Sequence, residues 1–314
     1  MTPPLGIVEG FFGRAWSWQA RAEAVRFLAP RGYGFYLYAP KADPWLRRRW
    51  QEPHPDKEAE ALANFASLCR AEGVRFGIGL SPFELHRHEQ RDWKRVLAAR
   101  VAALDAFRPD DLAILFDDMR GDQPDLAERQ AEIVAVAADA TKTTRILCCP
   151  SYYSDDAILD VAFGIRPPRY LEQLGKALDP AVGIFWTGPE VVSREYSPGH
   201  LIRVAEALGR KPWLWDNYPV NDGPRMAQHL HLRGVTGRSG LAPYLSGHAV
   251  NPASQPLLSR IPLLTLAESY RLGAAYDYGE AFRRAAREVL GDALAERVER
   301  DLLTLQDRGR DRLG

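Results

Sequence analysis

Two adjacent carboxylates, Asp117 and Asp118, directly follow the apolar residues 113–116, AILF. Burying one carboxylate beside apolar side chains is unfavourable, and a second one opposes its ionisation because like charges repel. Such a pair can be driven apart, with one group ionised and the other protonated, as general acid–base chemistry requires. The alternative is that the pair lies in water at a loop or that one Asp caps the next helix.

Polar and aromatic side chains follow other apolar runs in the same way. They include Glu9, Gly10, Lys41, Asp43, Ser81, Tyr152, Tyr153, Thr187, Asn217, Asp222 and Asn251. Lys, Asp, Asn, Tyr and Trp side chains together suit a polyhydroxylated ring that has one apolar face. If these positions meet at one place, they form a sugar-binding site, although the ends of strands are often polar in any protein.

The elements that must position these residues alternate along the chain. Strand-like runs cover residues 6–12, 34–39, 74–80, 112–116, 145–149, 182–186, 212–215 and, most weakly, 244–250. Helical patterns cover residues 17–28, 57–71, 91–107, 126–137, 168–178 and 198–208. This α/β alternation predicts a (β/α)8 TIM barrel, in which all strand ends converge on one face. An open doubly wound sheet is the alternative.

The remaining features bound the class of protein. Residues 1–260 are expected to form the catalytic barrel, and residues 261–314 the last barrel helix with a C-terminal helical extension. The 41 basic and 41 acidic residues cancel, which argues against a nucleic-acid or anionic-membrane partner. The sequence shows neither a signal peptide nor a long apolar span, and its three cysteines have no CxxC spacing, so we expect a cytoplasmic protein.

Six motifs occur in order: GIVEGFFGRAW, YLYAPKADP, AILFDDM, FWTGPEVVS, WDNYPVND and VNP. Together they resemble glycoside hydrolase family 84, the family of O-GlcNAcases and bacterial hexosaminidases, over roughly residues 5–275. The resemblance implies a (β/α)8 barrel and retaining hydrolysis of β-linked N-acetylglucosamine (GlcNAc). The sugar's own 2-acetamido oxygen would attack the anomeric carbon and form an oxazoline. It implies no cofactor or metal, and a GlcNAc-containing glycan or glycoprotein as the partner.

The resemblance also implies roles for individual residues. Asp117 would accept the acetamido N–H, and Asp118 would act first as the acid and then as the base. The implied substrate-binding residues are Gly10, Lys41, Tyr153, Trp215, Asn217, Asp222 and Asn251, with Cys149 lining the acetyl pocket. For Trp215 the alternative is a packed core residue.

Three positions depart from the family pattern. Ala42 stands where the family commonly has Asp, and Phe83 stands where it usually has Gly. Tyr152 stands before Tyr153 in place of a Glu, which leaves open which tyrosine meets the substrate. These departures concern the region around the ring or the aglycone, so the natural aglycone stays open, as does the oligomeric state.

Two other functions are compatible with parts of the sequence. A glycan-binding barrel without activity would bind the sugar without turning it over, although such a protein would typically lose one of the two carboxylates. A metal-dependent amidohydrolase would use HRHE at residues 86–89 and HLH at residues 229–231 as ligands. The second motif is expected in a helix, where positions i and i+2 do not share a face.

Overall fold

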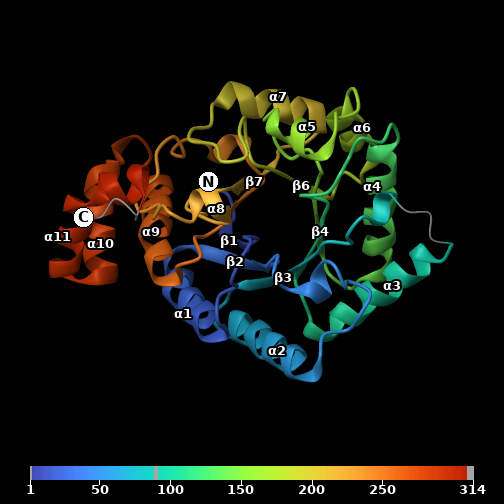
Figure 1. The fold of residues 1–314 in the computed structure, drawn as a ribbon, viewed down its shortest axis with the longest axis horizontal. Coiled ribbons are helices and arrows are strands. Elements are labelled where there is room, and N and C mark those ends of the chain that lie inside the picture. Colours follow the sequence, from blue (N-terminus) through green and yellow to red (C-terminus); the bar gives the residue numbers. More distant parts are fainter. Residues whose placement is uncertain (1, 88–90, 310–314) are drawn as a thin grey trace.

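The computed structural model describes residues 2–87 and 91–309 of the 314-residue chain. Eight parallel strands close into a barrel in sequence order (Figure 1). They are β1 (Leu5–Glu9), β2 (Tyr33–Tyr38), β3 (Arg75–Leu80), β4 (Asp111–Leu115), β5 (Arg145–Cys149), β6 (Gly183–Trp186), β7 (Trp213–Asp216) and β8 (Gly247–Val250). Pairing of Leu5 with His248 and of Ile7 with Val250 joins β1 to β8. This pairing confirms the barrel and excludes the open sheet.

The strands are continuous apolar runs because both of their faces are covered. Every residue of β1 (LGIVE) and of β4 (DLAIL) is buried. A parallel sheet with helices on its outer face has no solvated side, so the alternation of polar and apolar residues disappears. The short apolar runs of the sequence therefore predict the strand positions to within a few residues.

The longer helices form a ring around the barrel (Figure 1). The helices up to residue 272 are α1 (Trp18–Leu28), α2 (Asp56–Ala71), α3 (Trp93–Leu104), α4 (Leu126–Ala140), α5 (Ile158–Phe163), α6 (Tyr170–Ala177), α7 (Pro198–Leu208), α8 (Gly223–Met226) and α9 (Pro256–Leu272). The six expected helices are present, whereas the short α5 and α8 were not expected. The hydroxyls of Ser17 and Ser197 cap α1 and α7 by accepting a backbone N–H. No helix of the described chain is both long and apolar enough to cross a membrane.

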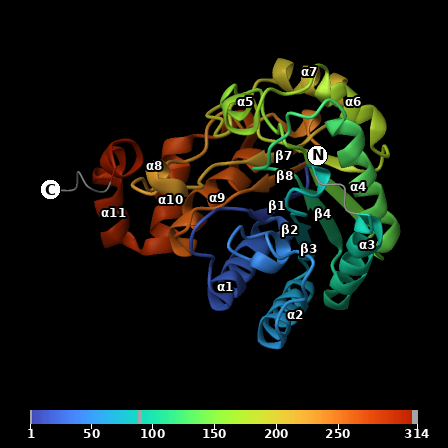
Figure 2. The same cartoon turned by 45° about the vertical axis from the view of Figure 1, so that its right-hand side comes forward.

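Two further helices, α10 (Tyr278–Leu290) and α11 (Asp292–Arg300), lie beyond α9 on the side away from the barrel (Figure 2). They share a small apolar core with α9, in which Ile261 packs with Phe282 and Ala295. After α11 the chain returns towards the barrel. There the Gln306 side chain accepts hydrogen bonds from the backbone N–H of Leu232 at 2.9 Å and of Arg233 at 3.1 Å.

Candidate active site

A pocket of about 130 Å3 opens where the carboxyl ends of the strands converge. Its lining comes from the ends of β1, β4, β5, β6, β7 and β8. The lining residues are Gly10, Phe12, Asp117, Asp118, Cys149, Tyr153, Thr187, Val191, Val192, Trp215, Asn217, Val220, Asp222 and Asn251. The pocket therefore lies on the face where barrel enzymes hold their chemistry.

The two carboxylates reach the same pocket because the backbone turns between them. The strand β4 ends at Leu115, and Asp118 adopts a left-handed backbone conformation with φ of 59°. Consecutive residues of a regular strand point to opposite faces, so a continued strand would have sent one carboxylate away. A non-glycine residue rarely adopts positive φ, and such strain concentrates at functional sites.

Asp117 is held by one cation and keeps one oxygen without a donor. The Lys41 ammonium pairs with Oδ2 of Asp117, and both side chains are almost fully buried. The Oδ1 atom of Asp117 is also buried, and it has no hydrogen-bond partner among the described residues. A buried acceptor without a donor is costly, so Asp117 presents a place for an N–H or O–H group brought by a ligand.

Asp118 lies in a different environment. Its Oδ1 accepts a hydrogen bond from the Tyr153 hydroxyl at 3.1 Å, and its Oδ2 lies 3.9 Å from Nζ of Lys41. Burial raises the pKa of Asp118, and the charge of Asp117 raises it further. Lys41, Arg47 and the Tyr153 hydrogen bond lower it but do not cancel this rise. Asp118 therefore keeps its proton to a higher pH than an ordinary aspartic acid does.

A chain of amide hydrogen bonds forms the opposite wall. Asn217 Oδ1 accepts from the Trp215 indole at 3.1 Å and from Nδ2 of Asn251 at 2.9 Å. Its Nδ2 donates to the Val191 carbonyl at 2.8 Å, and Oδ1 of Asn251 accepts from the Gly10 N–H at 3.2 Å. The ends of β1, β7 and β8 and the loop after β6 are therefore joined around the pocket.

The Trp215 ring requires a glycine at position 10. A Cβ at this position would lie 2.3 Å from Cζ2 of the Trp215 indole, a distance at which the ring must move. The glycine therefore allows the indole to lie against β1 and to line the pocket. On the same side, Oδ2 of Asp222 accepts the Phe12 N–H at 2.7 Å, which holds the loop after β1 against the loop after β7.

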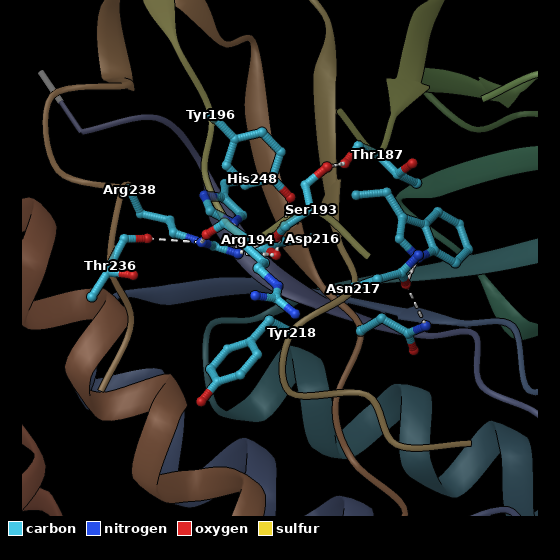
Figure 3. Close-up of polar contacts among 12 residues, drawn as sticks. Thr187, Ser193, Arg194, Tyr196, Asp216, Asn217, Tyr218, Thr236, Arg238 and His248 are labelled. Carbon is cyan, nitrogen blue, oxygen red and sulfur yellow. Dashed lines mark hydrogen bonds and ion pairs between the residues drawn. The ribbon is translucent and has the colours of Figure 1, made fainter. Parts of the chain in front are cut away.

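Behind this wall lies a buried ionic network centred on Asp216 (Figure 3). Arg238 donates to both carboxylate oxygens of Asp216, at 2.9 and 3.0 Å, and Tyr196 donates at 3.1 Å. Arg238 also donates to the Ser193 carbonyl at 3.0 Å, so it joins β7 to the loop that carries Val191. Burial alone would raise the pKa of Asp216, but Arg238 and His248 outweigh it and hold this pKa well below its usual range.

Comparison with known proteins places this barrel in a family. The family model described as beta-N-acetylglucosaminidase matches residues 5–307. The chain belongs to this β-N-acetylglucosaminidase family. Protein O-GlcNAcase of Rattus norvegicus and of Mus musculus are each 30% identical to it over 277 residues, or 85% of this chain. The chain spans only 30% of the length of these relatives.

A solved structure shows the same fold. A mutant of the Thermobaculum terrenum O-GlcNAc hydrolase superposes with a TM-score of 0.85 at 28% identity. The match covers 96% of this chain and 66% of that one. Membership in the β-N-acetylglucosaminidase family agrees with the resemblance seen in the six sequence motifs.

In this member of the β-N-acetylglucosaminidase family, the catalytic and binding residues implied by the sequence resemblance lie together, whereas Glu9, Asp43 and Ser81 do not line the pocket. The pocket lining includes Asp117, Asp118, Gly10, Tyr153, Trp215, Asn217, Asp222, Asn251 and Cys149, and Lys41 contacts Asp117. Of the two tyrosines, Tyr153 lines the pocket, whereas Tyr152 is fully buried and donates to the Gly164 carbonyl at 2.6 Å. Ala42 is exposed and Phe83 is half-buried, and neither lines the pocket.

Sequence reasoning missed some lining residues and the network behind them. Val191 and Phe12 carry no chemical signal of their own, although both lie inside motifs that mark the family. Asp216 is the last residue of β7, but its side chain belongs to the network behind the pocket. Trp215 and Asp216 are neighbours on β7, so their side chains point to opposite sides, and only Trp215 lines the pocket.

The described histidines of the amidohydrolase hypothesis do not line the pocket. Residues 229–231 lie in a loop after α8, so their expected helical placement is wrong; Nδ1 of His231 lies 2.8 Å from the Val220 carbonyl oxygen. His86 is buried, with Nε2 2.6 Å from the Arg120 carbonyl oxygen, and burial lowers its pKa. His88 and Glu89 lie outside the described residues. Within the described ranges, no group of three or more His, Cys, Asp or Glu side chains is suited to hold a metal ion.

Proposed function

We propose that this chain hydrolyses terminal β-linked GlcNAc with retention of configuration, through an oxazoline intermediate. The observation that carries the proposal is the difference between two adjacent carboxylates in one pocket. Asp117 pairs with Lys41 and keeps a buried oxygen free to accept, whereas the pKa of Asp118 is raised by burial and by the charge of Asp117. Substrate-assisted glycoside hydrolysis needs one carboxyl group in each of these states.

In the first step, Oδ1 of Asp117 accepts the N–H of the 2-acetamido group. The acetamido oxygen attacks the anomeric carbon, and the bond from that carbon to the aglycone oxygen breaks. Asp118 transfers its proton to the departing oxygen, so the aglycone leaves as a neutral alcohol. The positive charge of the oxazolinium ring lies beside ionised Asp117, which stabilises it.

In the second step, Asp118 is a carboxylate and takes a proton from a water molecule. That water adds to the anomeric carbon from the side that the aglycone left, and the bond from this carbon to the acetamido oxygen breaks. The acetamido group is restored, Asp118 is protonated again, and the released GlcNAc keeps the β configuration. Two inversions at one carbon therefore give net retention.

The remaining lining residues are proposed to hold the sugar. Tyr153 donates a hydrogen bond to Asp118 and is proposed to contact the acetamido group, and Trp215, which lines the pocket, is proposed to wall the part that holds the acetyl group. Lys41, Asn217, Asp222, Asn251 and the backbone at Gly10 are proposed to bind the sugar hydroxyls and the acetamido group. The partner is accordingly a GlcNAc-containing glycan or glycoprotein.

The test is turnover of an aryl β-N-acetylglucosaminide by the wild type and by Asp117→Asn and Asp118→Asn. Each substitution should lower kcat/KM by about 100-fold or more, since general acid–base catalysis by Asp118 contributes about 10²–10⁴-fold and electrostatic stabilisation by Asp117 about 10²–10³-fold. Asp122→Asn is the matched control, because Asp122 follows closely, pairs with Arg120 and does not line the pocket.

Proton NMR of the first product formed should show the β anomer. Loss of less than tenfold in both site variants, or an α product, would contradict the proposal. Tight binding of GlcNAc without any turnover would instead indicate a binding protein.

A further inference from the structure

The segment after α11 is joined to the loop that carries Asp222 through a strip of chain, residues 229–233. On one side of this strip, the Gln306 side-chain oxygen accepts the backbone N–H groups of Leu232 at 2.9 Å and of Arg233 at 3.1 Å. Among the described residues, these two N–H groups have no other acceptor. One amide oxygen thus holds two consecutive peptide groups of the strip.

On its other side, the same strip is bonded to the loop after β7. The Asn221 side chain donates through Nδ2 to the His229 carbonyl at 2.9 Å. The His231 ring lies with Nδ1 2.8 Å from the Val220 carbonyl oxygen. These two contacts fix the residues that directly precede Asp222, the carboxylate on this side of the pocket.

Asp222 depends on this support more than Asn217 does. Three hydrogen bonds from other parts of the pocket wall hold the Asn217 side chain. The Asp222 side chain is half-buried and has one hydrogen bond among the described residues, from the Phe12 N–H to Oδ2 at 2.7 Å. Its other oxygen is open to a hydroxyl group of the sugar. The position of this carboxylate therefore depends largely on the backbone that carries it.

Apolar packing also ties the strip to the C-terminal segment. Leu232 and Leu305 both belong to the apolar core that α9, α10 and α11 share, and the Leu230 N–H donates to the Leu305 carbonyl at 2.9 Å. We propose that Gln306 is a positioning residue, which fixes Asp222 through the strip and so strengthens binding of the sugar hydroxyls. This inference rests on the proposed function, in which Asp222 contacts the sugar.

The experiment measures kcat and KM for an aryl β-N-acetylglucosaminide. Gln306→Met keeps a side chain of similar length but removes the acceptor, so KM should rise about 3- to 10-fold, the range expected from loss of one net hydrogen bond. The value of kcat should stay within about twofold of wild type, because a contact to a remote hydroxyl acts alike in the ground state and the transition state.

Two variants at neighbouring positions of the same segment serve as controls. Gln306→Glu keeps an oxygen that accepts both N–H groups, so its KM should stay at the wild-type value. Asp307→Asn breaks the ion pair of Asp307 with Arg233, which holds the same strip from the solvent side. Both side chains of this pair are partly exposed, so KM should again stay at the wild-type value.

A double-mutant cycle tests the route from Gln306 to the pocket. In Asp222→Ala, the further change Gln306→Met should alter kcat/KM by less than about twofold, because the carboxylate that the strip positions has been removed. Additive effects of the two changes would overturn the inference. If Gln306→Met does not fold, Gln306→Ser, which also cannot reach the strip, takes its place with the same expected rise of KM.

The other outcomes separate the inference from the proposed function. A wild-type KM in Gln306→Met, in an enzyme that hydrolyses the glycoside, would overturn the inference and leave the proposed function standing. An equal rise of KM in Gln306→Glu or in Asp307→Asn would show a general loosening of the C-terminal segment, which also overturns it. Absence of hydrolysis by the wild type would overturn the proposed function itself.

Discussion

Replacing Lys41 with Gln should move the basic limb of the pH profile of kcat/KM to higher pH. Lys41 forms an ion pair with the Asp118 carboxylate, with 3.9 Å between Nζ and Oδ2, and it lowers the pKa of that carboxyl group. Removing a positive charge favours the protonated form, so the pKa of Asp118 must rise. The proposed first step needs protonated Asp118, and activity should therefore persist to higher pH, although its maximum will be lower because Lys41 also contacts Asp117.

The size of the shift follows from the distance. Two unit charges about 4 Å apart interact by about 1 kcal/mol in water and by about 4 kcal/mol in surroundings with an effective dielectric constant near 20. The Asp118 side chain is 24% exposed, so the interaction energy of its charge with Lys41 should lie between these two values. Since about 1.4 kcal/mol corresponds to one pKa unit, the limb should move by about 0.7 to 3 units.

The assay is the pH dependence of kcat/KM for an aryl β-N-acetylglucosaminide, which reports on ionisations of the free enzyme. Lys41→Arg is the matched variant, because it keeps the charge and changes only the shape of the group. Its basic limb should stay within about 0.3 units of wild type, a small part of the shift expected from charge removal. An unshifted limb in Lys41→Gln, or an equal shift in both variants, would refute the assignment of Asp118 as the proton donor.

Three further outcomes follow from the structure. Arg238→Met leaves the Asp216 charge buried without its partner and should lower the free energy of unfolding in urea by about 3–5 kcal/mol. Because the pKa of Asp216 is lowered in the folded protein, ionised Asp216 stabilises the fold at pH values above its unfolded pKa near 4, and this stabilisation is lost as the pH falls. The difference in free energy of unfolding between the wild type and Arg238→Met should therefore narrow in acid. Gly10→Ala should weaken calorimetric binding of a thiazoline inhibitor by about tenfold or more, because the new methyl group meets the Trp215 indole, whereas Gly34→Ala, with open space at its Cβ, should not. Cys69 and Cys148, which do not line the pocket, should react with a thiol reagent only after unfolding, since both are buried and burial raises the pKa of each thiol.

Much of the fold and of the candidate site could be predicted because a barrel turns sequence order into spatial position. The apolar run before Asp117 had to be a buried strand, and the side chains that follow parallel strands meet at one end of a closed barrel. The positions of Lys41 and Asn251 beside the pocket follow from this rule, although they are 210 residues apart.

Other features depend on contacts that no local pattern encodes. The left-handed backbone at Asp118 comes from its surroundings, since Asp tolerates that conformation better than most residues but adopts it only rarely. Arg238 lies 22 residues after Asp216 in a loop without regular structure, so nothing in the sequence marks the two as partners. His231 looked like part of a helix, but its hydrogen bond to the Val220 carbonyl holds it in a loop.

The pairing of β1 with β8 also sets an order of events during synthesis. The chain emerges from the ribosome starting at its N-terminus, yet β1 has no partner on one side until residue 250 has been made. The loop after β7 gains its contact with Gln306 later still. Nascent chains that stop before residue 250 therefore expose an unpaired edge of β1, which makes them targets for chaperones and prone to aggregation.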